Sequence, residues 1–246
     1  MLERVAVTLG LVALGAHAPA ARCEVIYNSA TESISSVVGV GAVEGGVPGQ
    51  EIKQQSTLHF SDSAFASASG TFYGGSGYAD ARTSLMLDVS TQLNTVSVLG
   101  TNSGNAQIGS PLLTAGTRSS TLFRVSFTLD QPYAYDISAQ LARGTSEDLI
   151  NTLELGGGSG ALFRASGGTE GGTFQQSGVL GPGSYYFLGR SLLGGDAYLN
   201  TLDFHFDESW NANLHLTAVP LPAGFGLLAS ALSLLGLGKS WIRVRA

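Results

Sequence analysis

The chain has 246 residues, 34 of them glycine, and a formal net charge of −6 at pH 7. A chain of this length can form one domain of roughly 200 residues with a full core, or two smaller ones. The segment from Arg22 to Pro222 contains 17 acidic and 8 basic residues. Because nucleic-acid binding depends on clustered lysine and arginine, we expect no nucleic-acid partner for this segment.

The N-terminus has the three parts of a secretory signal peptide. Arg4 supplies a positive start, and residues 5–16 form an apolar run that is too short to span a membrane comfortably. Ala18-Pro19-Ala20 then offers a pattern of small residues for cleavage after Ala20. We therefore expect residues 1–20 to be a signal peptide and the protein to be exported.

The single cysteine, Cys23, follows this segment directly. A lipoprotein signal has a small residue before its cysteine. Because Arg22 occupies that place here, we expect no lipid anchor on Cys23. One cysteine cannot form an internal disulfide, so we expect a free thiol, with intermolecular pairing as the alternative.

Alternating apolar and polar residues in the central region predict strands. In 121–129 the alternation separates Phe123, Val125, Phe127 and Leu129 from Leu122, Arg124, Ser126 and Thr128. The same period places three further sets on inner faces: Tyr135, Ile137 and Ala139; Leu202, Phe204 and Phe206; Leu214, Leu216 and Ala218. Glycine-rich stretches separate these segments and predict turns. We therefore expect residues 24–218 to form an all-β domain, an antiparallel β-sandwich or jelly roll.

Three segments of this region call for separate predictions. Residues 61–87, in which serine alternates with small residues, fit either a flat strand pair or ordered low-complexity sequence. Pro182-Gly183 predicts a hairpin turn that places Tyr185 and Phe187 on one face of the following strand. Residues 145–155 predict a short helix, capped by Thr145 or Ser146 and ended by Gly156 to Gly158.

Few residues of the domain suggest chemistry. Asp203, His205 and Asp207 share one face of a predicted strand, and they fit either a metal site or an ordinary solvated face. Further carboxylates lie in predicted turns, without the defined pairing that a glycosidase requires; they are Asp130, Asp136, Glu147, Asp148 and Asp196. His59, His205 and His215 are expected to be ordinary strand residues. We therefore predict no catalytic residue, no metal and no cofactor.

Aromatic side chains offer one route to a carbohydrate ligand, because exposed rings stack on sugars. The candidates are Tyr73, Tyr78, Tyr133, Tyr135 and Trp210. The alternative is that these rings belong to the core.

The C-terminus contains an uncharged apolar run over residues 223–238. As a helix this run would rise about 24 Å, close to the hydrocarbon thickness of a bilayer. Trp241 suits the membrane interface, and a basic tail follows that would remain in the cytoplasm; its residues are Lys239, Arg243 and Arg245. A transmembrane helix in this orientation leaves the central domain on the far side of the membrane, in agreement with the signal peptide.

Two prolines immediately precede the apolar run. They hold the chain extended and without amide donors, a shape that suits recognition by a processing enzyme. The motif Val219, Pro220, Leu221, Pro222, Ala223, followed by the apolar run and the basic tail, resembles a PEP-CTERM sorting signal of the VPLPA type. Leu221 replaces the glutamate of the common motif. The resemblance covers residues 219–246 and leaves the central domain uncharacterised.

The resemblance implies a destination and a partner. An exosortase-type enzyme of the inner membrane would process an anchored intermediate near the two prolines, and the mature protein would reach the cell surface or the extracellular matrix. The expected function is thus that of a secreted structural protein associated with exopolysaccharide. The alternative is a secreted carbohydrate-active enzyme, or a lectin-like carbohydrate-binding module, with the same sorting tail.

Overall fold

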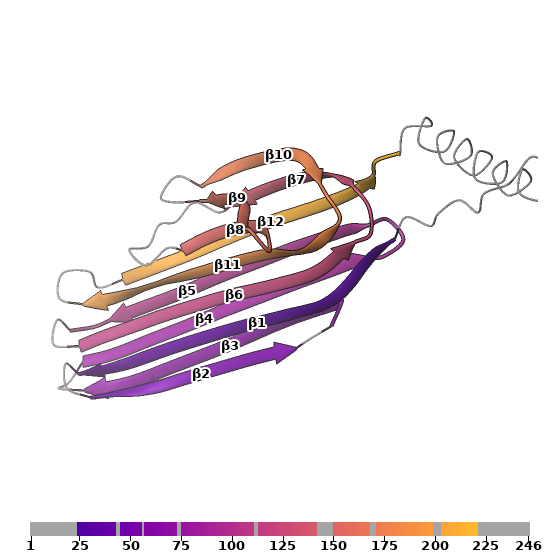
Figure 1. Cartoon of the computed structure of the whole chain (residues 1–246). Helices are drawn as coiled ribbons and strands as arrows, with labels where there is room; N and C mark the ends of the chain where they lie inside the picture. The colour runs from indigo at the N-terminus through magenta and orange to yellow at the C-terminus, as the bar shows by residue number, and fades with distance from the viewer. Residues whose placement is uncertain are drawn as a thin grey trace, which may run out of the picture.

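A computed structural model describes residues 24–42, 45–55, 57–72, 75–110, 113–141, 150–167, 171–198 and 203–220. These residues form an all-β structure of two layers, each an antiparallel sheet of six strands (Figure 1). The strands are β1 (Val25–Ala42), β2 (Gly45–Gln55), β3 (His59–Phe72), β4 (Gly75–Ser90), β5 (Thr95–Ile108), β6 (Leu113–Leu129), β7 (Tyr133–Leu141), β8 (Ile150–Gly157), β9 (Gly160–Ser166), β10 (Gly172–Leu180), β11 (Gly183–Tyr198) and β12 (Asp203–Ala218).

The first sheet has the strand order β2-β1-β6-β11-β8-β9, and the second has the order β10-β7-β12-β5-β4-β3. β1 lies over β3 and β4, and β6 lies over β4 and β5. The chain changes sheet at seven connections. The other four connections are hairpins within one sheet, namely β1–β2, β3–β4, β4–β5 and β8–β9. The expected β-sandwich is therefore confirmed.

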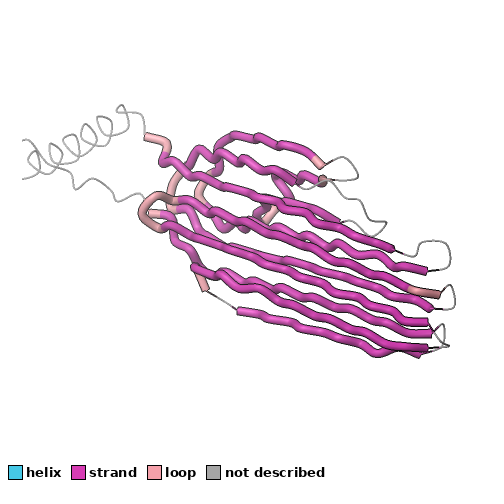
Figure 2. The backbone as a smooth tube through the Cα atoms, turned by 180° about the vertical axis from the view of Figure 1, so that it is seen from behind, coloured by secondary structure: helices cyan, strands magenta, loops and turns pink. Residues whose placement is uncertain are grey.

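The long strands lie side by side along the length of the molecule, and the short strands β7 to β10 gather at one end (Figures 1 and 2). The alternation predicted for 121–129 is confirmed in β6, where Phe123, Val125, Phe127 and Leu129 are buried. The described residues within 61–87 form the strand pair β3–β4, which has fourteen residue pairs in register. Ser/Ala alternation therefore encodes regular strands here.

Two detailed predictions are wrong. Ile150–Gly157 is strand β8 rather than helix, because Asn151, Leu153 and Leu155 alternate into the core and pairing with β11 overrides the local helix propensity. The Pro182-Gly183 turn does not close a hairpin. It carries the chain from β10 in the second sheet to β11 in the first, although Tyr185 and Phe187 do share a face as expected.

The core divides into two hydrophobic clusters. The larger cluster lies at the end where the short strands β7 to β10 gather, and it contains the stacked rings of Phe123 and Trp210, whose centroids are 5.9 Å apart. The smaller cluster, at the other end, is built mainly from alanine and valine side chains. Between the two clusters lies a group of buried polar side chains that we call the polar belt; its members are Ser36, Thr83, Asn102, Thr117, Ser119, Thr121 and Ser191.

The polar belt joins the two sheets through hydrogen bonds. Asn102 of β5 donates its Nδ2 to the Oγ of Ser191 on β11 at 2.8 Å. The Nε1 of Trp210 on β12 donates to the Oγ1 of Thr121 on β6 at 3.2 Å. Both bonds connect residues 89 positions apart in the sequence, so the belt fixes how the sheets face each other.

Candidate functional site

The folded domain ends directly before the predicted sorting motif. β12 ends at Ala218, and the backbone N–H of Val219 donates to the carbonyl of Pro132 at 3.0 Å. Val219 and the exposed Pro220 are the last described residues. Several predicted features lie outside the described residues: Leu221, Pro222 and Ala223 of the motif, the basic residues Lys239, Arg243 and Arg245, the predicted signal peptide of 1–20, and Cys23. No helix capable of crossing a membrane is present in the described part of the chain.

Asp203, His205 and Asp207 lie on one face of β12, as the alternation predicted. All three are exposed on the outer face of the second sheet, where they pair with Gln107, Asn105 and Ser103 of β5. Within the residues that the structure describes, no group of three or more metal-ligating side chains converges. This face is therefore a row of solvated polar groups rather than a preformed metal centre.

The remaining carboxylates are spread over both sheets. Asp136 points outward from β7 in the second sheet, whereas Asp196 points outward from β11 in the first sheet. Asp130 is exposed beyond the end of β6. Glu147 and Asp148 lie outside the described residues. Asp136 and Asp196, on opposite faces of the sandwich, cannot act on one bond.

Three of the five aromatic side chains considered for sugar stacking belong to the core instead, which is the alternative that the sequence left open. Tyr133, Tyr135 and Trp210 have exposed fractions of 0%, 8% and 3%, because each occupies an inward position of its strand. Tyr78 is exposed at 41% on the outer face of β4, and Tyr73 lies outside the described residues. These inward rings stabilise the core and are unavailable for stacking on a sugar.

An ordered polar cluster, unpredicted from the sequence, lies on the outer face of the first sheet. The hydroxyl of Tyr186 on β11 donates to Oε1 of Glu154 on β8 at 2.5 Å. Arg164 of β9 holds the other carboxylate oxygen of Glu154 through Nε at 3.1 Å and Nη2 at 3.0 Å. The guanidinium of Arg124 on β6 lies 4.7 Å from the centre of the Tyr186 ring.

The electrostatics of this cluster follow from these contacts. The hydrogen bond to Glu154 raises the pKa of Tyr186 above its ordinary value, and the positive charges of Arg124 and Arg164 partly oppose that rise. The Glu154 side chain is only 11% exposed, whereas that of Arg164 is 71% exposed. Tyr186 and Arg164 therefore bind the shielded carboxylate of Glu154 directly, and Arg124 lies against the Tyr186 ring.

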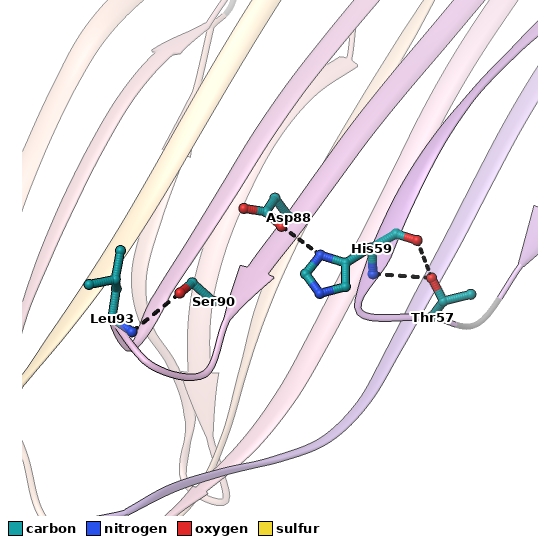
Figure 3. Close-up of polar contacts among 5 residues, drawn as sticks. All are labelled: Thr57, His59, Asp88, Ser90 and Leu93. Carbon is teal, nitrogen blue, oxygen red and sulfur yellow. Dashed lines mark hydrogen bonds and ion pairs between the residues drawn. The ribbon is translucent and has the colours of Figure 1, made fainter.

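A second group of polar contacts lies at one end of the second sheet, on its outer face (Figure 3). His59 of β3 approaches Asp88 of β4, with 2.6 Å between Nδ1 and Oδ1, and both side chains are more than 60% exposed. The hydroxyl of Thr57 accepts from the backbone N–H of His59 at 3.1 Å. Since exposed ion pairs contribute little, these contacts order the strand ends rather than form a reactive site.

A hollow of about 470 Å³ opens at the same end of the sandwich as Figure 3. It is lined by residues of the β1 start, the β2–β3 connection and the β4–β5 turn, namely Glu24, Val25, Ile26, Tyr27, Leu58, Thr91, Gln92 and Asn94. Burial, and secondarily the nearby Tyr133, raise the pKa of Tyr27 to about 12, so this phenol stays protonated at neutral pH. Glu24 is the one carboxylate among these lining residues.

The two outer faces of the sandwich carry opposite charge. Among the side chains that the structure describes, the strand faces of the first sheet present four arginines and two carboxylates; these are Arg118, Arg124, Arg164 and Arg190 with Glu154 and Asp196. The corresponding face of the second sheet presents one arginine and five aspartates; these are Arg82 with Asp80, Asp88, Asp136, Asp203 and Asp207. We call them the basic face and the acidic face.

Sequence reasoning missed the basic face because its residues come from four strands far apart in the chain. A local signal existed only for Glu154 and Arg164, which flank a glycine-rich turn at hairpin spacing. Comparison with models of known protein families gave no match, and no curated protein matched the chain.

Proposed function

We propose that the chain is a non-enzymatic structural component of the cell surface or extracellular matrix, delivered by an exosortase-type system and associated there with exopolysaccharide. The observation that carries the proposal is the order of VPLPA motif, apolar run and basic tail over residues 219–246. This order suits an intermediate held in the inner membrane, with the central domain outside it.

The fold is compatible with this role. The last strand, β12, ends at Ala218, and Val219 is tied to Pro132, so Pro220 lies at the surface of the sandwich. A membrane enzyme can therefore reach a motif that starts here without unfolding the domain. Since prolines hold the chain extended and donate no backbone hydrogen bond, the motif does not compete with the β12 ladder.

The test separates the prolines from the apolar run. The double variant Pro220→Ala, Pro222→Ala should still be exported but should remain in the inner membrane at full length, because the apolar residues 223–238 still hold it in lipid. The exposed Pro182→Ala provides a matched control and should be processed like wild type. Cell fractionation and the intact mass of the C-terminus, in a host that carries the processing enzyme, give the readout. Wild type that is never trimmed, or a double variant that is trimmed normally, refutes the proposal.

A further inference from the structure

We propose that copies of this protein stack face to face, with the basic face of one copy on the acidic face of the next. The proposal goes beyond the proposed function and does not depend on it, because it concerns only the folded domain. Its basis is charge complementarity between two surfaces of the same molecule. Electrostatic matching of this kind selects partner and orientation more than it adds raw affinity.

The basic face holds its charges in a fixed arrangement. Arg124 is positioned over the ring of Tyr186, which is itself held by the shielded Glu154. Arg190 of β11 pairs with Leu122 of β6, two residues from Arg124, so the two arginines are diagonal cross-strand neighbours. In the described part of the chain Arg190 has no ion-pair partner. Its side chain is exposed on the outer face of β11.

The acidic face presents exposed carboxylates on three strands. Asp203 and Asp207 are exposed on β12, four residues and about 13 Å apart along the strand. Asp136 extends the face onto β7, and Asp80 and Asp88 extend it onto β4. Arg82 is the one described arginine on this face, and its guanidinium lies 4.9 Å from the centre of the Phe65 ring.

The shape of the two faces allows close contact. The four long strands of each sheet cover roughly 900 Å² at the usual strand spacing and rise, which is comparable with the roughly 800 Å² that each partner buries in a stable complex. Between the charges the acidic face carries mostly small polar side chains, for example Ser63, Ser84 and Thr101 in one cross-strand row. Twisted sheets pack readily face to face at about 30°, as the two sheets of a sandwich do.

This contact uses two different surfaces, so it does not close on itself. Each added copy presents a new basic or acidic face, and the expected product is a linear stack of variable length. Exposed charges are screened by salt over about 10 Å at 0.1 M, so the stack should dissociate as ionic strength rises. Stacks of this kind would suit a protein with a structural role.

The experiment is a charge-swap series measured by sedimentation velocity on the purified, exported protein at about 20 mM and about 500 mM salt. Wild type should associate at low salt and dissociate at high salt. The basic-face variant Arg124→Glu, Arg190→Glu and the acidic-face variant Asp203→Lys, Asp207→Lys should each weaken association at least tenfold when alone. Mixing the two should restore it, because each variant keeps one native face and gains one reversed face.

Controls separate this contact from other causes. Arg82→Glu makes the same charge change on the acidic face, so it should leave association unchanged or stronger. All variants carry the same termini, so association through those segments would not respond to the swaps. Circular dichroism must show native β structure in each variant.

Two results overturn the proposal. The first is wild type that is monomeric at both salt concentrations. The second is a mixture of the two variants that fails to associate. If wild type is monomeric and its arginines bind a soluble polyanion such as polygalacturonate, the basic face is assigned to an anionic polymer instead. Since proline variants at positions 220 and 222 test delivery and the charge swaps test stacking, either proposal can fail without the other.

Discussion

Asn102 and Ser191 join the two sheets at the centre of the sandwich, with 2.8 Å between Nδ2 and Oγ. The Oδ1 of Asn102 also accepts from Thr83 at 3.3 Å, so one buried amide connects three strands. Buried polar groups are costly unless they are paired. These polar groups interrupt the apolar core in its middle. Only a relative position of the two sheets that pairs them avoids the cost of burying them, so the hydrogen bonds select one packing of the sheets.

Replacing Asn102 with alanine should lower the free energy of unfolding by about 1–3 kcal/mol, because it leaves the hydroxyls of Thr83 and Ser191 buried with one partner fewer. Ser61→Ala, at an exposed position of β3, should change it by less than about 0.5 kcal/mol. Urea unfolding of the three proteins measures the difference. Equal midpoints for Asn102→Ala and wild type would show that the polar belt does not stabilise the fold.

Glycine at position 189 provides a test of core packing. A Cβ built there would lie 2.1 Å from Cε1 of Phe123, whose ring is fully buried between Phe187 and Trp210. Gly189→Ala should therefore cost about 1–3 kcal/mol through overpacking. Gly39→Ala in β1, where a Cβ would meet no atom within 4 Å, is the matched control and should be neutral or stabilising. Thermal or urea unfolding distinguishes them, and equal effects would contradict the packing argument.

The hydrogen bond between Tyr186 and Glu154 predicts a shifted titration. Because the bond to a carboxylate favours the protonated phenol, the pKa of Tyr186 lies above its ordinary value of 10.0. Glu154→Gln removes the negative charge and should lower that pKa toward the ordinary value. NMR of ring-labelled tyrosine against pH measures it residue by residue. Tyr185, which donates to the carbonyl of Gly181 instead, is the internal control; a Tyr186 signal that does not move would refute the assignment.

The sequence predicted the parts of the fold that depend on local alternation. The alternate residues of β6 face inward as expected, and so do Ile137 and Leu214, because period-two burial is a property of the strand itself; those of β6 are Phe123, Val125, Phe127 and Leu129. The predictions were wrong where neighbouring strands, rather than the local sequence, determine the structure. Ile150–Leu155 has helix-favouring residues, yet it is a strand because β11 and β9 flank it. Tyr133 and Trp210 read as possible binding residues, and only the position of the other sheet shows that they are core.

The basic face illustrates the same limit for function. Arg124, Glu154 and Tyr186 meet only because β6, β8 and β11 lie in one sheet, and that strand order does not follow the chain. The residues of the proposed sorting motif are contiguous, so their pattern is visible in the sequence. Signals carried by contiguous residues can thus be predicted without a structure, whereas surfaces assembled from distant strands cannot.

A buried carboxylate gives the pH-dependent prediction. The Glu32 side chain on β1 is fully buried, and its Oε2 accepts from the N–H of Thr57 at 3.4 Å. Among the described residues its Oε1 has no hydrogen-bond partner. Burial raises the pKa of Glu32 above its ordinary value of 4.5, and the backbone hydrogen bonds from Thr57 and from Glu32 itself oppose that rise only in part.

A raised pKa means that the folded state holds the proton more tightly than the unfolded state. The contribution of Glu32 to stability is therefore complete below pH 4.5 and is lost as the pH rises through the higher value of the folded state. Glu32→Gln, which cannot ionise, should be more stable than wild type at neutral pH, by roughly 1 kcal/mol. That advantage should shrink toward zero as the pH falls to about 4. Urea unfolding of both proteins at several pH values measures it, with Asp136→Asn at an exposed position as the control for the loss of one carboxylate. An advantage that grows as the pH falls would have the wrong sign and would refute the burial argument.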